Sequence, residues 1–461
     1  MTDVLFFSYR STDNWWQYLA QSLNFTQSVA VVSDMRGDGT INIVDSFYTN
    51  LRENDCASLA IKHLSLPVCE EIIRRCRVLR NLKKQRAMSM IGAMWLAIDE
   101  VVKTEKPRLV MSFIIDRYVI DILDRVAQSY GIKFIGMTAS IFPEHVMFMD
   151  RGKLIALRKP EKNEIELGKK QVLSKNFVPS YVVNNKKFSI KQYWRTFLSF
   201  KVRGLAYQFI RYIKQDRLNL HYLDALNYLD HKPRLGDIVV LKHLNQDWEK
   251  KLQTTAREKR VFIGLQLLPE ASLDYWLDDL SLLNNEGVVL KICNVLGAAG
   301  YTLFVKDHPL QFGFRKRAFI QALTQLPFVV LIPYEATASR LISECPITVT
   351  FTGTIGFESV VAGACSIVSG AYYADEQHFV HFHNLDDIEL LPEKIDEFHK
   401  NNSQISDEAI DKLIENILAA SAPGDLFGFR NFDQNKPECV EKAAELVQTL
   451  NLYLSQFLKA A

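Results

Sequence analysis

The 461-residue sequence lacks the marks of secreted and membrane-spanning proteins. Its seven cysteines are scattered and form no C-x-x-C pair, so we expect neither a disulfide framework nor a structural zinc site, and we favour a reducing compartment. No run approaches ~20 uninterrupted apolar residues, which predicts no transmembrane helix. The opening residues show no basic segment followed by a cleavage site. We therefore expect a cytoplasmic protein without a signal peptide.

The chain also has little net charge, no low-complexity tract and no internal repeat. A formal net charge of +2 argues against a general polyanion binder, and no nucleic-acid-binding module is recognisable, so nucleic acid is not an expected partner. The composition is 48% hydrophobic and 23% charged, which is typical of a globular protein. A chain of this length exceeds one compact core, so we expect two domains.

β-rich runs alternate with helical segments in two separate parts of the chain. The runs are 4–9, 28–33, 108–113 and 133–137 in the first part, and 260–266, 302–306, 328–332, 347–351 and 365–369 in the second. Such alternation predicts parallel sheets with helices on both faces. We therefore predict an α/β protein with two doubly wound Rossmann-type domains facing a cleft.

Domain boundaries follow from changes in composition. We expect residues 1–158 and 251–430 to form the two domains, with a helical, aromatic and basic connector at 159–250. Residues 431–461 are expected to form a C-terminal helix, which we place against the N-terminal domain. Ligands of open α/β sheets bind at the carboxyl ends of the strands, so the residues that follow the strands are the candidates for a site.

Two motifs in the second domain place ionisable side chains after strands. In Q-L-L-P-E-A-S (266–272), Pro269 ends the strand and Glu270 would project into the cleft, although an acid in a first helical turn is also favourable. In Lys306-Asp307-His308-Pro309, the proline holds His308 extended and turns it away from the sheet edge. Histidine beside lysine suits a phosphate, or a leaving group that needs a proton; a surface turn is an equal alternative.

A third motif joins a strand to a helix. Thr352-Gly353-Thr354-Ile355-Gly356 follows the strand 346–351 and precedes the expected helix 357–362. Glycine permits the tight turn, and the helix start offers unpaired N–H groups to an anion. Thr352 and Thr354 add hydroxyl groups, and Glu358 is placed to accept hydrogen bonds from a ribose. Such turns are common in α/β proteins, so the combination of the three motifs predicts a nucleotide-binding cleft.

With these motifs the sequence resembles the bacterial capsule polysaccharide biosynthesis family. That family includes β-Kdo transferases and enzymes that transfer nonulosonic acids. The resemblance covers roughly 260–375, and a looser one covers 105–152. It implies a GT-B fold with the acceptor on the N-terminal domain. It also implies a CMP-activated donor sugar, such as Kdo or pseudaminic, legionaminic or sialic acid, and an acceptor in a capsule or lipopolysaccharide glycan.

The resemblance also implies roles for single residues. Glu270 stands where the Kdo enzymes have the Asp nucleophile of a retaining double displacement, and it is longer by one methylene group. His308 and Pro309 would contact the CMP phosphate, with Thr352 and Thr354 on the helix side.

The chemistry of such a transfer suits these residue types on general grounds. A carboxylate stabilises or traps an oxocarbenium-like centre. The charge developing on CMP needs donors, which Lys306, His308 and the N–H groups of the Gly353 turn would supply. No Asp-x-Asp motif is present where a metal would be needed. We therefore expect no metal and no further cofactor.

Candidate residues on the acceptor side are less specific. Asp116 and Arg117 follow a strand of the first domain, and Arg36 and Asp38 lie in the loop after its second strand; a surface pair and a glycine turn explain them as well. Basic runs occur at 74–86 and 186–217, the second interleaved with aromatic residues. The second run suits an anionic membrane surface or a lipid-linked acceptor, whereas a solvated helix packing on the core explains either run.

Two other functions fit the same sequence. A transferase that uses a UDP- or GDP-sugar, or a sugar-nucleotide epimerase, would share the cleft and the phosphate turn. A capsule-assembly partner that binds glycan or lipid without catalysis would not depend on Glu270.

Overall fold

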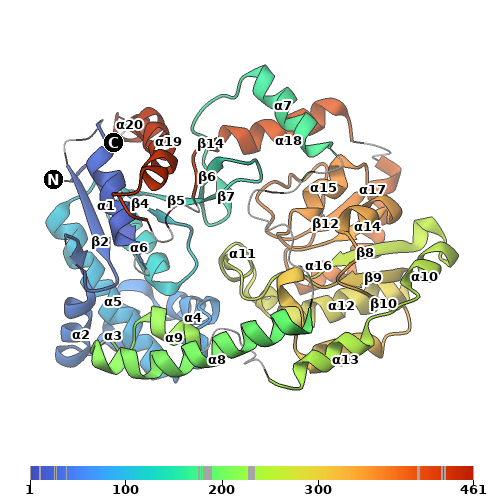
Figure 1. Cartoon of the computed structure of the whole chain (residues 1–461), viewed down its shortest axis with the longest axis horizontal. Helices are drawn as coiled ribbons and strands as arrows, with labels where there is room; N and C mark the ends of the chain where they lie inside the picture. Colours follow the sequence, from blue (N-terminus) through green and yellow to red (C-terminus); the bar gives the residue numbers. More distant parts are fainter. Residues whose placement is uncertain are drawn as a thin grey trace.

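Two β-sheets organise the chain (Figure 1). The computed structural model describes the chain except residues 1, 10, 11, 25, 27, 38, 175, 176, 178, 180–188, 227–233, 402–404, 427, 428, 430, 431, 460 and 461. Figure 1 shows the two sheets in separate halves of the molecule, each covered by helices, with a long helix running beneath both.

The first sheet has the strand order β14-β6-β5-β4-β1-β2-β3, with β7 paired to β6. Its parallel strands are β1 (Val4–Ser8), β2 (Val29–Ser33), β3 (Ile41–Asn42), β4 (Leu109–Phe113) and β5 (Lys133–Ala139). β1 and β4 are buried along their whole length, as parallel strands covered on both faces should be. Leu5 and Phe7 point to one apolar cluster, and Val4 and Phe6 to another, so both faces carry a core.

Helices of the first half cover both faces of this sheet. The helices on the Leu5 face include α5 and α6, and the Val4 face is covered by α1 and the C-terminal helices. Their bounds are α1 (Asp13–Ser22), α2 (Val44–Glu53), α3 (Cys56–Leu64), α4 (Leu66–Arg75), η1 (Leu79–Asn81), α5 (Lys84–Glu105) and α6 (Tyr118–Ser129).

The second sheet has the order β10-β9-β8-β11-β12-β13, and every pairing in it is parallel. Its strands are β8 (Arg260–Gly264), β9 (Thr302–Lys306), β10 (Val329–Ile332), β11 (Ile347–Val349), β12 (Cys365–Val368) and β13 (Val380–His381). Val261 and Ile263 face one core and Phe262 faces the other. The expected class, an α/β protein with two doubly wound Rossmann-type domains, is confirmed.

The helices of this half lie on both faces of the second sheet. The main ones are α10 (Trp248–Thr254), α11 (Ala271–Tyr275), α12 (Asn285–Ala298), α13 (Arg317–Thr324), α14 (Ala338–Glu344), α15 (Ile355–Val361), α16 (Leu385–Glu389) and α17 (Leu391–Asn401). Short 3-10 turns are η2 (Asp237–His243), η3 (Arg257–Lys259), η4 (Leu280–Leu283) and η5 (Pro309–Gln311).

Alternation of strands and helices did not predict an antiparallel edge on the first sheet. β6 (His145–Asp150) pairs antiparallel with β5, and β7 (Lys153–Leu154) and β14 (Ser421–Pro423) pair antiparallel with β6. Before β14, α18 (Asp407–Ala419) packs on α7 (Lys162–Val172). The end of the range 251–430 therefore belongs to the first sheet rather than the second.

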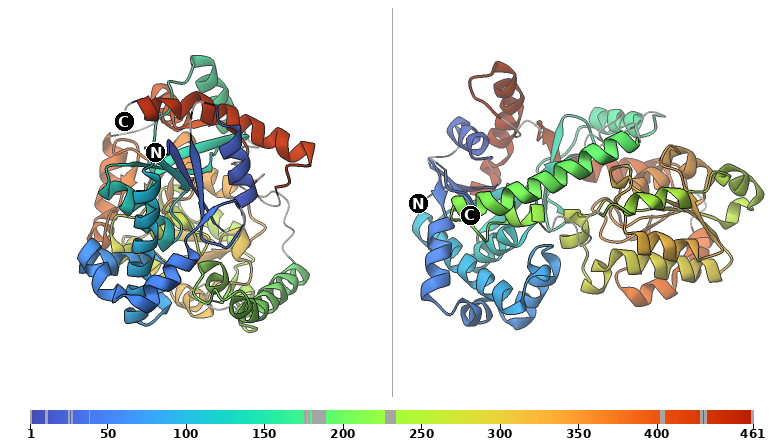
Figure 2. Two further views of the ribbon diagram at one scale, coloured as in Figure 1. Left: turned by 90° about the vertical axis from the view of Figure 1, so that its left-hand side faces the viewer. Right: turned by 60° about the horizontal axis from the view of Figure 1, so that its bottom comes forward.

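The C-terminal segment forms two helices rather than one. α19 (Pro437–Tyr453) and α20 (Ser455–Lys459) join the apolar cluster of β1 and α1, so 431–461 lies on the N-terminal domain. Within 159–250 the long helix is α8 (Ile190–Ile213), followed by α9 (Leu220–Leu226). The second view of Figure 2 shows α8 passing across both halves. In the described part of the chain, no helix is long and apolar enough to cross a membrane.

The halves share a tightly packed interface next to α11. Tyr275 is buried in the main core of the N-terminal domain, and Trp276 packs against that core and a cluster shared by both halves. Gly152 and Gly370 both lie against Trp276, where a β-carbon at residue 152 would approach the indole to 2.7 Å. The segment just after Glu270 is thus anchored in the opposite domain.

Candidate functional site

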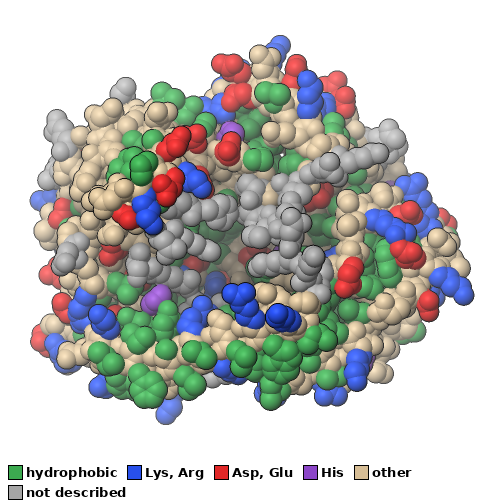
Figure 3. Space-filling model, viewed as in Figure 1, with side chains coloured by type: hydrophobic (Ala, Val, Ile, Leu, Met, Phe, Trp, Pro, Cys, Tyr) green, Lys and Arg blue, Asp and Glu red, His purple; other side chains and the backbone are tan. Residues whose placement is uncertain are grey.

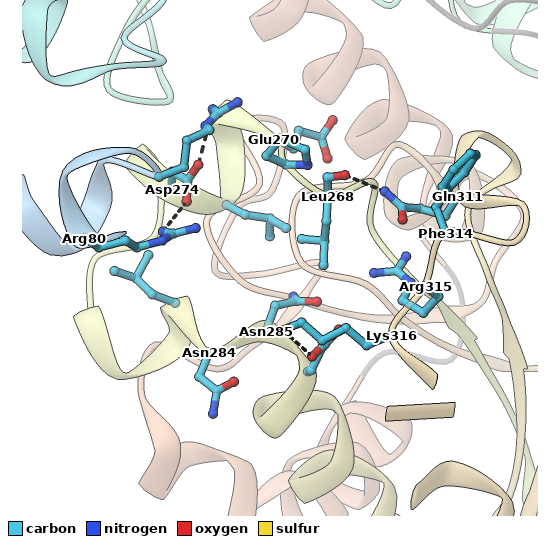
Figure 4. Close-up of a pocket in the computed structure, with 15 residues that line it drawn as sticks. Arg80, Leu268, Glu270, Asp274, Asn284, Asn285, Gln311, Phe314, Arg315 and Lys316 are labelled. Atoms are coloured by element: carbon cyan, nitrogen blue, oxygen red, sulfur yellow. Dashed lines mark hydrogen bonds and ion pairs between the residues drawn. The ribbon is translucent and has the colours of Figure 1, made fainter. Parts of the chain in front are cut away.

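A pocket lies between the two domains with Glu270 on its wall (Figure 4). Its empty volume is about 700 Å³, part of it open to solvent. The second domain lines it with Leu268, Glu270 and Asn285 among others, and the N-terminal domain contributes Arg77 and Arg80. Pockets at domain boundaries are preferred sites for small-molecule ligands.

Glu270 is half-buried at the N-cap of α11. Burial raises its pKa to about 7, and the nearby Arg77 opposes the rise. The carboxyl is therefore partly protonated near neutral pH, the range in which a group can act as nucleophile, base or acid. The structure places Glu270 on the wall of this pocket.

Gln266 ties Glu270 to the strand–helix turn. With its amide oriented to satisfy both neighbours, it donates to Glu270 Oε2 (3.2 Å) and accepts from the Gly353 N–H (3.0 Å). Thr352 Oγ1 donates to Ser272 Oγ (2.7 Å) a short distance away. The first and third motifs therefore meet, as expected from neighbouring strands β8 and β11. Gln266 itself was missed as a functional residue, although it opens the first motif.

The second motif is held by a buried ionic cluster. Asp307 accepts hydrogen bonds from Arg315 Nε (3.1 Å) and the Tyr334 hydroxyl (2.6 Å). Arg315 also donates to the Gln266 carbonyl, so it joins the second motif to the first. Asp307 is thus fully engaged in positioning the turn, a role the sequence did not reveal.

His308 is neutral in this setting. Burial lowers its pKa to about 4, against the pull of Asp307. Its Nδ1 accepts from the Leu310 N–H (3.2 Å), which leaves the proton on Nε2. The side chain is therefore a hydrogen-bond donor at neutral pH rather than a reserve of protons. Lys306 is buried at the end of β9, and burial lowers its pKa.

Close contacts with neighbouring side chains explain why the third motif contains glycines. A β-carbon at residue 353 would come within 2.6 Å of Gln266, and one at residue 356 within 2.4 Å of the Tyr373 hydroxyl. Tyr373 also donates to the Gly353 carbonyl (2.6 Å), fixing the turn. Burial raises the pKa of Glu358 to about 7, against a hydrogen bond from Thr354.

Not every candidate reaches the pocket. Glu270 lines it, whereas the following candidates do not: Lys306, His308, Pro309, Thr352, Gly353, Thr354 and Glu358. Hydrogen bonds through Gln266 and Arg315 thus connect the three motifs, and the first motif contributes the candidate that lines the pocket.

The first residues of the basic run 74–86 lie in the interface between the two domains rather than on a solvated helix. Arg75 is buried and donates to the carbonyls of Asp274, Leu277 and Asp278, while Arg74 donates to that of Leu280. Arg77 and Arg80 form ion pairs with Asp274 at 3.3 and 3.0 Å. Only the fold could reveal this role, because it depends on how the domains meet.

The acceptor-side candidates fall into three groups. Asp116 and Arg117 form an ion pair (2.7 Å), Arg117 stacks on the Tyr9 ring, and Arg77 donates to the Asp116 carbonyl. This pair is therefore one residue removed from the pocket wall. Arg36 binds Asp45 and the Lys214 carbonyl and does not line the Glu270 pocket. Asp38 lies outside the described residues.

Potential metal ligands gather away from the pocket. In the ranges that the structure describes, one group of three has ligand atoms within 4.8 Å of one another: Glu376, His381 and His383. His381 Nε2 lies 2.8 Å from the Asp375 carbonyl, and none of the three lines the Glu270 pocket.

Comparisons with known proteins give structural neighbours only. No family model matches the sequence, and no curated protein matches it. A β-Kdo 2,7 transferase, KpsC of Thermosulfurimonas dismutans, shares 12% identity over 77% of this chain and 89% of that one, with a TM-score of 0.33. UDP-GlcNAc 2-epimerase from Neisseria meningitidis shares 13% over 91% and 98%, with a TM-score of 0.28. A glycosyltransferase from Rickettsia africae shares 10% over 97% and 98%, with a TM-score of 0.29.

Proposed function

We propose that this chain is a GT-B glycosyltransferase for an acidic ulosonic sugar. The donor is a CMP-activated Kdo or nonulosonic acid, such as pseudaminic, legionaminic or sialic acid, and the acceptor is a capsule or lipopolysaccharide glycan. The observation that carries the proposal is Glu270: a titratable carboxyl on an interdomain pocket, bonded through Gln266 to a glycine turn and facing arginines of the other domain.

Glu270 is the proposed nucleophile. Its carboxylate attacks the anomeric C2 while the C2–O bond to the phosphate breaks and CMP leaves with the electron pair. The acceptor hydroxyl then attacks C2, Glu270 is released as carboxylate, and the hydroxyl proton passes to water. Two inversions retain the configuration. Only the ionised carboxyl can react, so the rate should rise as pH increases through about 7.

The leaving phosphate needs hydrogen-bond donors rather than a general acid. Neutral His308, which follows β9, offers its Nε2–H, and the turn at Thr354 follows β11, on the other side of β8 in the sheet. Glu358 is assigned to the ribose. These groups supply the stabilisation that a divalent ion gives in other transferases, so we propose catalysis without a metal or further cofactor.

Charge on the pocket wall favours an acidic sugar. Arg77 and Arg80 share the single carboxylate of Asp274, and Lys316 pairs with Glu286 at 3.0 Å. The two guanidinium groups on this wall can donate hydrogen bonds to the carboxylate at C1 of an ulosonic acid, a group that a neutral hexose lacks.

Calorimetry with CMP, UDP and GDP tests the donor class. We expect selective CMP binding, weakened about tenfold by His308→Ala, because one hydrogen bond to a charged phosphate is lost. Preference for UDP or GDP would overturn the CMP assignment in favour of another sugar-nucleotide transferase or an epimerase. If no nucleotide binds, turnover of CMP-sugars with synthetic acceptors decides between the transferase and a non-catalytic glycan- or lipid-binding partner.

A further inference from the structure

Helix α8 carries a second apolar face that no part of the described chain covers. Seventeen large hydrophobic residues are exposed in the described chain, and eight of them lie on this one helix. They are Ile190, Trp194, Leu198, Val202, Leu205, Phe209, Tyr212 and Ile213. Their concentration on 24 residues exceeds the scattered exposure that is normal for a protein surface.

The exposed residues form one stripe. From Trp194 to Tyr212 they recur every three or four positions, which places them on the same side of an α-helix. The helix packs on the protein through a different side: Tyr193 and Phe197 are buried against Phe314. The exposed stripe is therefore not needed for holding α8 in place.

The charges that border the stripe have one sign. The sequence of α8 contains Lys191, Arg195, Lys201, Arg203 and Arg211 and no acidic residue, and Lys214 follows directly. In Figure 3 the lower edge of the molecule, where α8 lies in Figure 1, shows hydrophobic side chains together with Lys and Arg. A basic helix with an apolar face bearing aromatic residues is the pattern that lies in the interface of an anionic bilayer.

We infer that α8 docks on an anionic phospholipid surface, with its stripe in the headgroup region and its lysines and arginines against the lipid phosphates. A second copy of this chain is a poorer occupant, because two such helices would bring like charges together. The first turns of α8 reach the pocket wall: the rings of Tyr193 and Phe314 lie 4.9 Å apart, and Phe314 lines the Glu270 pocket. Docking would hold that pocket near the bilayer, within reach of a lipid-linked acceptor.

Vesicle sedimentation of the full chain tests this inference without relying on the proposed chemistry. We expect the wild type to bind vesicles that contain phosphatidylglycerol, weakly bind vesicles of phosphatidylcholine alone, and lose binding as salt is raised. The variant Leu198→Glu/Leu205→Glu should bind the anionic vesicles at least about tenfold more weakly, since two exposed stripe residues become charged. Lys191→Gln/Arg195→Gln should lose about fivefold per charge.

The matched control removes as much exposed apolar surface elsewhere. Leu167→Glu/Leu452→Glu changes two leucines that are 59% and 66% exposed on α7 and α19 and should bind like the wild type. Circular dichroism confirms folding of each variant. Equal binding of the stripe and control variants, or no binding of wild type to anionic vesicles, would overturn the inference. A lipid-free dimer that the stripe variant abolishes, without vesicle binding, would assign the face to a second copy instead.

Discussion

The two walls of the Glu270 pocket differ in how they are built. The wall from the second domain comes from strand ends, where the first motif and its neighbours are joined by Gln266 and Arg315. The opposite wall comes from a short stretch around Arg77 and Arg80, whose neighbour Arg75 fastens the domains together. One wall carries Glu270, the proposed nucleophile, and the other supplies charge and alignment. Chemistry and architecture are therefore separable by mutation.

The largest effect should come from the reactive wall. Glu270→Gln keeps the shape but removes the carboxylate, and we expect kcat to fall on the order of a thousandfold or more. Glu358→Gln is the matched change, because burial raises the pKa of that glutamate to about 7 as well, but it does not line the pocket. It should raise KM by about tenfold with a smaller loss of kcat. Steady-state kinetics with the donor identified by the nucleotide panel measures kcat and KM of both variants. Equal losses of kcat in the two variants would contradict the role of Glu270 as nucleophile.

The aligning wall is tested by Arg75→Ala. Three backbone carbonyls and Glu71 lose their buried partner, so the free energy of unfolding should fall by about 3 kcal/mol. Arg74→Ala is the control, because Arg74 is exposed and reaches one carbonyl; its cost should stay near 0.5 kcal/mol. Urea denaturation of both variants compares them. A small effect of Arg75→Ala would mean that the apolar contacts of Tyr275 and Trp276 hold the domains unaided.

A smaller effect concerns pH. The folded protein holds a proton on Glu270 up to about pH 7, whereas the unfolded chain releases it near the ordinary glutamate pKa of 4.5. Stability attributable to this group therefore falls as pH rises from about 4.5 to 7 and stays low above it. Glu270→Gln should match the wild type at pH 4.5 and be more stable by about 1–3 kcal/mol at pH 8. Thermal melting at the two pH values measures this, and a difference independent of pH would contradict the shifted pKa.

The smallest effect should come from Arg80→Ala. It removes one of two cations that share Asp274, so binding of a CMP-activated acidic sugar should weaken about fivefold to tenfold while binding of CMP itself changes little. Arg86→Ala, an exposed arginine of the same basic run, should change neither. Calorimetry with CMP-sialic acid and CMP measures the contrast. Equal weakening for both ligands would place Arg80 at the nucleotide rather than at the sugar.

The sequence analysis pointed to the pocket wall of the second domain, whose motifs each follow a strand closely in the chain. Each motif of the second domain follows a strand, and parallel strands end at one edge, so spacing predicted that Glu270, His308 and Thr352 lie at the same edge of the sheet. The structure adds Gln266, Asp307 and Arg315, whose roles depend on side chains that meet across strands. The interface role of the arginines at 74–80 was not predicted, because a basic helical run has the same pattern whether it faces water or another domain. β14 escaped for a similar reason, since its partner β6 lies about 275 residues earlier in the chain.

Tyr275 has a consequence for dissecting the molecule. It belongs to the chain of the second domain, yet its ring completes the core of the first. An isolated N-terminal half would be left with a void there, and an isolated C-terminal half would carry Tyr275 and Trp276 into water. Neither half is therefore a modular unit that can be exchanged freely between proteins. Substitutions of Tyr275 and of the N-terminal core residues that contact it should be selected as pairs.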